Sequence, residues 1–127
     1  MSVLYVYVDG SDVEEHEAVL TSAFNRMAAR WSGIGAYFVD QQDASAAHMT
    51  TEDYPDRDLG INVPLSSFTG VQAAELLDFA RELSLQTGRD FVVGVCSDTG
   101  IADDLITLGA GAGERELSLL CYHLFGC

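Results

Sequence analysis

The chain contains no lysine, and its six basic residues are all arginines. Twenty aspartates and glutamates oppose them, so the formal net charge is −14 at pH 7. The negative electrostatic potential of such a chain repels nucleic acid and anionic membrane surfaces, and it speeds association with basic partners. We therefore expect a basic protein as the partner, and neither nucleic acid nor a membrane as a target.

Cysteine and long apolar runs are also scarce. Three cysteines, one of them the last residue, do not make a disulfide framework, and reduced thiols fit a cytoplasmic protein. The longest apolar run, residues 3–8, is too short to cross a bilayer, and no basic segment precedes it as in a secretory signal. Hydrophobic residues still make up 48% of the chain, enough for one folded core. We expect a single cytoplasmic domain spanning residues 1–127.

Apolar periodicity predicts the order of the secondary-structure elements. Alternating aliphatic and aromatic residues predict the first strand, and apolar positions three or four residues apart predict the helices. Capping-box pairs, Ser11 with Glu14 and Thr69 with Gln72, mark the starts of the first two helices. The predicted elements are strands over 3–8, 36–39, 59–65 and 91–96, a shorter strand over 104–108, and helices over 12–31, 69–88 and around 117–124.

The order β-α-β-β-α-β, followed by a helix, most simply gives a ferredoxin-like sandwich. This is an α/β (α+β) arrangement in which helices cover one face of a four-stranded sheet. A doubly wound mixed sheet is the alternative. The strand at 91–96 is almost entirely apolar, which favours a central position. Residues 40–58 are polar and aperiodic, and we expect them to form a long connection outside the sheet.

Fourteen of the twenty acids fall into three segments. The two strands of a β-α-β unit run the same way, so the first two segments would share one end of the sheet and gather eleven carboxylates there. The third segment would lie at the opposite end. Such clustering costs self-repulsion unless a cation or a basic partner uses it. The segments hold Asp9, Asp12, Glu14, Glu15 and Glu17; Asp40, Asp43, Glu52, Asp53, Asp56 and Asp58; and Asp98, Asp103 and Asp104.

Three carboxylates suggest a metal-dependent alternative. Asp9 after the first strand, Glu75 in the second helix and Asp98 after the strand at 91–96 resemble the carboxylate set of the ribonuclease H family. The resemblance implies a nuclease in which these residues hold divalent metals, since hard cations prefer oxygen ligands. The chain departs from the family because Asp9 leads into a helix rather than a β-hairpin. The charge of −14 also argues against a nucleic-acid substrate.

Two further motifs indicate little. Asp98-Thr99-Gly100 resembles the active-site loop of retroviral-type aspartic proteases, but that fold is nearly all β. Cys121-x-His123-x₃-Cys127 lacks the fourth ligand that a structural zinc site requires. We expect no cofactor and no catalytic constellation.

In size, charge and lack of a catalytic constellation, the chain resembles the bacterial immunity proteins that block toxin effectors, many of which are nucleases. The resemblance implies an inhibitor rather than an enzyme, with carboxylates that pair with arginines and lysines of the toxin's substrate cleft. A third interpretation is a ferredoxin-like ligand-binding or dimerising module that uses the open face of its sheet. The expected contact residues are Asp12, Glu15, Asp40, Asp43, Glu52, Asp53, Asp56 and Asp58, with Tyr54 as an aromatic anchor.

Overall fold

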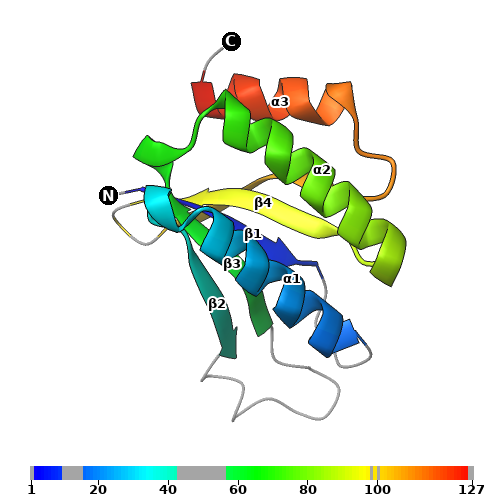
Figure 1. The fold of residues 1–127 in the computed structure, drawn as a ribbon. Coiled ribbons are helices and arrows are strands. Elements are labelled where there is room, and N and C mark those ends of the chain that lie inside the picture. Colours follow the sequence, from blue (N-terminus) through cyan, green and yellow to red (C-terminus); the bar gives the residue numbers. More distant parts are fainter. Residues whose placement is uncertain (1, 10–15, 43–56, 98, 100, 126–127) are drawn as a thin grey trace, which may run out of the picture.

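The computed structural model describes residues 2–9, 16–42, 57–97, 99 and 101–125. In that part of the chain the fold is α+β, with three α-helices and one five-stranded antiparallel sheet (Figure 1). The strands are β1 (Val3–Val8), β2 (Tyr37–Gln42), β3 (Arg57–Pro64), β4 (Phe91–Cys96) and β5 (Ala102–Leu108). The α-helices are α1 (Glu17–Arg30), α2 (Gly70–Thr87) and α3 (Glu114–Phe125), and two 3₁₀ turns are η2 (Ser32–Ile34) and η4 (Leu65–Ser67).

The strands lie in the order β2-β3-β1-β4-β5, and every neighbouring pair is antiparallel. The doubly wound mixed sheet is therefore wrong. Strands β1 and β2 do run the same way, as a β-α-β unit requires, but β3 lies between them and prevents a parallel pair. Strand β4 pairs on both sides, with β1 and β5, so its predicted interior position is confirmed.

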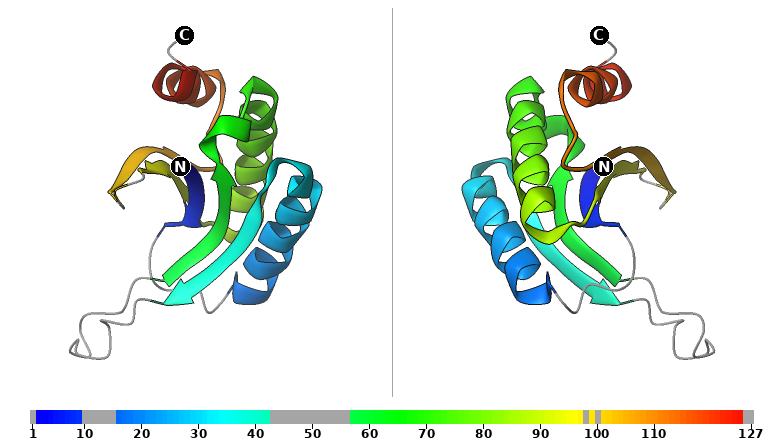
Figure 2. Two further views of the ribbon diagram at one scale, coloured as in Figure 1. Left: turned by 90° about the vertical axis from the view of Figure 1, so that its left-hand side faces the viewer. Right: turned by 90° about the vertical axis from the view of Figure 1, so that its right-hand side faces the viewer.

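Helices α1 and α2 lie against one face of the sheet, and α3 packs against α2 and β5 (Figure 2). Strand β1 shows why the helices cover this face, which carries its apolar side chains. Its residues Leu4, Val6 and Val8 are buried against them, and successive side chains of a strand point to opposite faces. Removing apolar surface of this kind from water stabilises the fold by roughly 1.5–3 kcal/mol per large side chain.

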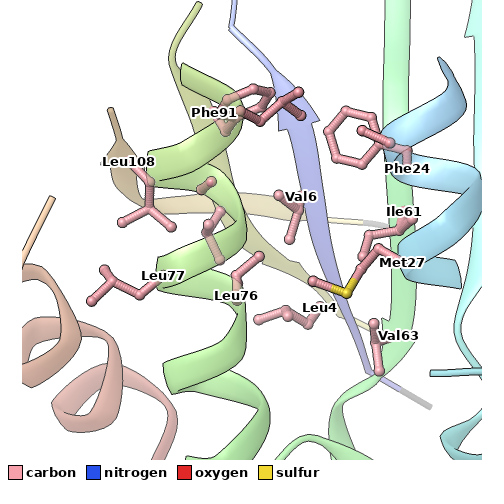
Figure 3. Packing of buried hydrophobic residues seen from close by; sticks show 14 of the residues in the cluster. Leu4, Val6, Phe24, Met27, Ile61, Val63, Leu76, Leu77, Phe91 and Leu108 are labelled. Carbon is pink, nitrogen blue, oxygen red and sulfur yellow. The ribbon is translucent and has the colours of Figure 1, made fainter. Parts of the chain in front are cut away.

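The core between the helices and the sheet joins residues from both layers (Figure 3). The Phe24 ring of α1 has no solvent exposure. It makes edge-to-face contacts with Phe79 of α2 and Phe91 of β4, at centroid distances of 5.5 and 5.8 Å. These contacts hold α1 against α2 and against β4, because aromatic pairs prefer an edge-to-face geometry in addition to being buried.

The ends of α2 follow the predicted signals. The capping box of Thr69 and Gln72 is present, and the Thr69 backbone N–H donates to Gln72 Oε1 at 3.0 Å. Gly88 ends the helix with a left-handed φ of 71°, and its N–H donates to the Ser84 carbonyl at 2.7 Å. A glycine adopts that conformation without a Cβ penalty. The Ser11–Glu14 pair lies outside the described residues.

Strands β2 and β3 extend into the stretch predicted to be a loop. Gln42 pairs with Arg57 and Gln41 with Asp58, so both ends of the 40–58 stretch belong to the sheet. Strand β5 likewise begins at Ala102 rather than at residue 104. Apolar periodicity underestimates these strands because backbone hydrogen bonds continue a ladder where no apolar side chain is needed.

Candidate binding surface on the open face of the sheet

One cross-strand row crosses all five strands on the face opposite α1 and α2, which we call the open face. Asn62 of β3 pairs with Tyr37 of β2 on one side and with Tyr5 of β1 on the other. Tyr5 in turn pairs with Gly94 of β4, and Gly94 with Asp104 of β5. Directly paired residues share a face, so these five positions form one line across the sheet.

Gly94 gives the Tyr5 side chain room to cross β4. A Cβ at Gly94 would collide with the phenol end of Tyr5, and it would lie 2.6 Å from the Asp103 carbonyl oxygen. The Tyr5 ring therefore passes directly over Gly94, and its hydroxyl donates a hydrogen bond to Asp104 Oδ1. Glycine is needed here for a close approach, not for an unusual φ.

A β-bulge aims Asp104 at the open face. The β4–β5 register shifts between Val93 and Gly94, so that Val93 pairs with Ile106 while Gly94 pairs with Asp104. Leu105 is the extra residue on β5. Without it, strict alternation would turn Asp104 towards the helix side; bulges commonly re-aim a side chain in this way.

The Tyr5 hydroxyl stays protonated. Burial first, and then the hydrogen bond to Asp104 and the negative charges of Asp104 and Asp103, raise the pKa of Tyr5 above its ordinary value. Each effect disfavours the phenolate. Tyr5 is only 6% exposed, so the buried ring and its bond to Asp104 form a fixed base for the row.

Tyr7 and Tyr37 complete the polar network above this base. The Tyr7 ring stacks on Tyr5 at 5.0 Å with an interplanar angle of 19°. Its hydroxyl donates to Asn62 Oδ1 at 2.7 Å, and Asn62 Nδ2 donates to the Tyr37 hydroxyl oxygen at 3.2 Å. Tyr37 remains 52% exposed. The tyrosine rings of the open face are thus held in place by hydrogen bonds within the chain itself.

The acids predicted to contact the partner are only partly within the described residues. Asp40 lies on β2, exposed and paired with Leu59, and Asp58 lies on β3, paired with Gln41. The other predicted contact residues, Asp12, Glu15, Asp43, Glu52, Asp53, Tyr54 and Asp56, lie outside the described residues. Their role stays a prediction.

The strand directions do place the described flanks of the first two acidic segments at one edge. Val8, the end of β1, pairs with Phe91, the start of β4, and Gln42, the end of β2, pairs with Arg57, the start of β3. Asp9 lies at this edge, and its backbone N–H donates to the Asp90 carbonyl at 2.8 Å. Asp90 is therefore a further acid at this edge, which the sequence does not reveal until the direction of β4 is known.

Of the Asp9, Glu75 and Asp98 set proposed for metal, the two described members, Asp9 and Glu75, lie at opposite edges of the sheet. Glu75 accepts a hydrogen bond from Trp31 Nε1 at 3.2 Å, and the Trp31 carbonyl accepts from Ala36, just before β2 begins. Glu75 thus lies near the edge where β1 and β2 start, whereas Asp9 lies where β1 ends. Asp98 is outside the described residues. Among the residues whose placement is described, no group of three or more His, Cys, Asp or Glu side chains could hold a metal ion.

Sequence reasoning missed the tyrosine row, although part of its signal was present. The alternation within residues 3–8 puts Tyr5 and Tyr7 on the face opposite Leu4, Val6 and Val8, and two aromatic side chains on the face away from the core indicate a specific role there. Tyr37, Asn62 and Asp104 carry no such local signal, because only the strand register brings them together.

Comparison with protein-family models, with curated proteins and with solved structures finds no match for this chain. No helix in the described ranges combines the length and apolarity needed to cross a membrane.

Proposed function

We propose that this chain is a binding module that takes up a basic protein on the open face of its sheet. The observation that carries the proposal is the row Tyr37–Asn62–Tyr5–Gly94–Asp104, with Tyr7 stacked beside it. Tyrosine is enriched among the residues that dominate binding energy at protein interfaces. A surface already fixed by hydrogen bonds loses little conformational entropy when a partner docks.

Charge supports a cationic partner. The net charge of −14 attracts a basic surface and raises the association rate at low salt. The row itself holds a carboxylate, Asp104, and the exposed ring of Tyr37 suits an arginine or lysine side chain through cation–π contact. A second copy of this chain would bring the same negative charge, so we propose a different protein rather than a homodimer.

Aromatic rings on an open antiparallel sheet can also stack nucleic-acid bases. Such proteins pair their aromatics with positive charge that follows the phosphate backbone. The row contains no arginine, and the chain as a whole would repel phosphate. The geometry and charge together therefore favour a basic protein over single-stranded RNA or DNA.

We also propose a finer assignment of the fold. The order β2-β3-β1-β4, with helices after β1 and β3, supports a ferredoxin-like arrangement for the first six elements. Strand β5 and helix α3 would then be additions to it, and β5 supplies Asp104 to the row. A ferredoxin-like module leaves one sheet face uncovered, which is the face used in the present proposal.

Within this proposal, inhibition of a bacterial toxin in the cytoplasm is the specific role we favour. The mechanism would be occlusion: arginines and lysines of the toxin's substrate cleft pair with carboxylates while the tyrosines provide the central contact. Acids at the edge near Asp9 would extend this contact, whereas Asp40 pairs with the buried Leu59 and therefore lies on the helix side of the sheet. No catalytic step by this chain is needed, and the dispersed positions of Asp9 and Glu75 give no support to the nuclease alternative.

The test compares two tyrosines of similar exposure on different surfaces. Tyr37, 52% exposed, lies on the open face, and Tyr122, 64% exposed, lies on α3. A partner captured from the source cells would be purified and its binding to the wild type, Tyr37→Ala and Tyr122→Ala measured by surface plasmon resonance over a range of salt concentrations. We expect Tyr37→Ala to weaken binding about tenfold or more, as at a hot spot, and Tyr122→Ala to change it less than about twofold.

The salt series is the second readout. The association rate should fall steeply as ionic strength rises, because salt screens charge steering. The proposal is overturned if binding ignores salt, if the partner is acidic, if Tyr122→Ala weakens binding while Tyr37→Ala does not, or if a single-stranded oligonucleotide binds the open face instead.

A further inference from the structure

A groove lies between α1 and α2, on the helix side of the sheet and away from the open face. Its volume is about 420 Å³, which falls within the roughly 300–1,000 Å³ of typical small-molecule sites. Its apolar floor includes the buried side chains of Ala23, Met27 and Leu83 and the half-buried ring of Phe79. Arginines line the α1 wall and carboxylates line the α2 wall.

Most of these charges already have partners. Arg30 pairs with Glu75 at 2.9 Å, and Trp31 Nε1 holds the same carboxylate at 3.2 Å. Asp78 pairs with Arg81 at 3.1 Å. Arg26 and Glu82 are different: within the described part of the chain, neither has an ion pair or a side-chain hydrogen bond. They form one unpaired cation and one unpaired anion in the same groove.

The contacts between the helices set the levels of Arg26 and Glu82 along the helix axes. Arg30 meets Glu75 while Phe24 meets Phe79, so α1 and α2 run in opposite directions. Arg26 lies between those two α1 positions, and Glu82 lies one turn beyond Phe79. The two charges therefore flank the Phe79 ring along the groove. At 1.5 Å per residue, their separation along the helix axes is about 6 Å.

We propose that this groove binds a small zwitterion of dipeptide size, with its carboxylate at Arg26, its ammonium group at Glu82 and an apolar side chain on Phe79. An extended residue spans about 3.5 Å, so a ligand of two residues matches this axial separation better than a free amino acid does. Guanidinium and carboxylate groups match in a charge-assisted, bidentate geometry. A net-neutral ligand also enters the field of a −14 chain without the repulsion that a simple anion would meet.

The experiment titrates the full chain with the dipeptide phenylalanylalanine and follows backbone amide shifts by NMR. We expect saturable shifts confined to α1 and α2, with a dissociation constant of about 1 mM, typical of a ligand held by few contacts. Removing either charge, by amidation of the carboxylate or acetylation of the amine, should weaken binding about tenfold, as should replacing the dipeptide with phenylalanine.

Paired variants identify which residue meets which charge. In Arg26→Gln the dipeptide and its amide should bind equally, and in Glu82→Gln the dipeptide and its acetylated form should bind equally. Arg115→Gln and Glu114→Gln carry the same charge changes on α3, outside the groove, and should leave binding within about twofold of the wild type.

The proposal is overturned if no saturable binding occurs, if the shifts lie elsewhere, if the singly charged ligands bind as well as the dipeptide, or if the α3 controls weaken binding as much as the groove variants. Since the groove and the open face lie on opposite sides of the sheet, this failure would leave the proposed function untouched. Circular dichroism verifies the fold of each variant, all four positions being exposed.

Discussion

The two faces of the sheet are built by the same strands but held by different interactions. On the helix side, Leu4 and Val6 of β1 are fully buried in a cluster of apolar side chains. On the open face, Tyr5 and Tyr7 of the same strand are fixed by hydrogen bonds to Asp104 and Asn62. Packing on the helix side accounts for most of the stability. The stabilisation from burial grows with the apolar area removed from water, and most of the buried apolar residues lie on this side.

The open face illustrates a different use of aromatic residues. Hydrogen bonds contribute less net stability than burial but fix direction. A surface ordered in this way can present rings to a partner without becoming an apolar patch that invites aggregation. Substitutions on the two faces should therefore lower the free energy of unfolding by different amounts, and only those on the open face should show a dependence on pH.

The largest effect is expected from the helix side. Phe24→Ala should lower the free energy of unfolding by about 4 kcal/mol, since it leaves a cavity at a fully buried ring between α1, α2 and β4. Tyr7→Ala on the open face should cost only about 1–2 kcal/mol, since it removes the stacking contact with Tyr5 and the hydrogen bond to Asn62 but leaves no cavity in the core. Urea unfolding followed by Trp31 fluorescence gives both values. Equal losses would mean that the open face is part of the core.

An intermediate effect is expected at Gly94, where the Tyr5 ring crosses β4. Gly94→Ala should destabilise the chain by about 2 kcal/mol, because the new methyl group forces the Tyr5 ring off β4 and meets the Asp103 carbonyl. Gly111→Ala is the matched control, since nothing lies within 4 Å of its added Cβ, and it should stay within about 0.5 kcal/mol. If both variants have wild-type stability, the Tyr5 ring does not pass over β4 at Gly94.

The smallest effect is expected from Tyr5→Phe, which removes only the hydroxyl that donates to Asp104. At pH 8 it should cost about 1 kcal/mol. The pKa of Tyr5 is raised in the folded protein, so its contribution is fully present below the unfolded value of about 10 and is lost as pH rises through the folded value. The stability difference between wild type and Tyr5→Phe should therefore narrow above about pH 10. Unfolding curves at pH 8 and pH 11 test this, and a gap that widens at pH 11 contradicts the Tyr5–Asp104 bond.

Several elements could be predicted from sequence because their signals are local. The strand at 3–8, the interior strand at 91–96 and the capping box of Thr69 and Gln72 each depend on residues close in the chain, and each is confirmed. The predicted helix cover on one face of the sheet is also present. The ends of β2, β3 and β5 were missed because their residues are polar and their strand conformation depends on a neighbouring strand.

The sequence by itself determined the charge of −14, the α+β class and the alternation that sends Tyr5 and Tyr7 away from the core. Only the tertiary structure decided that Tyr37, Asn62 and Asp104 join them in one row, and that Arg26 and Glu82 flank Phe79 in one groove. The physical reason is that periodicity fixes the direction of a side chain relative to its own strand or helix. Which distant residue it meets depends on strand register, on the bulge at Leu105 and on how two helices pack, and these are set by the whole chain at once.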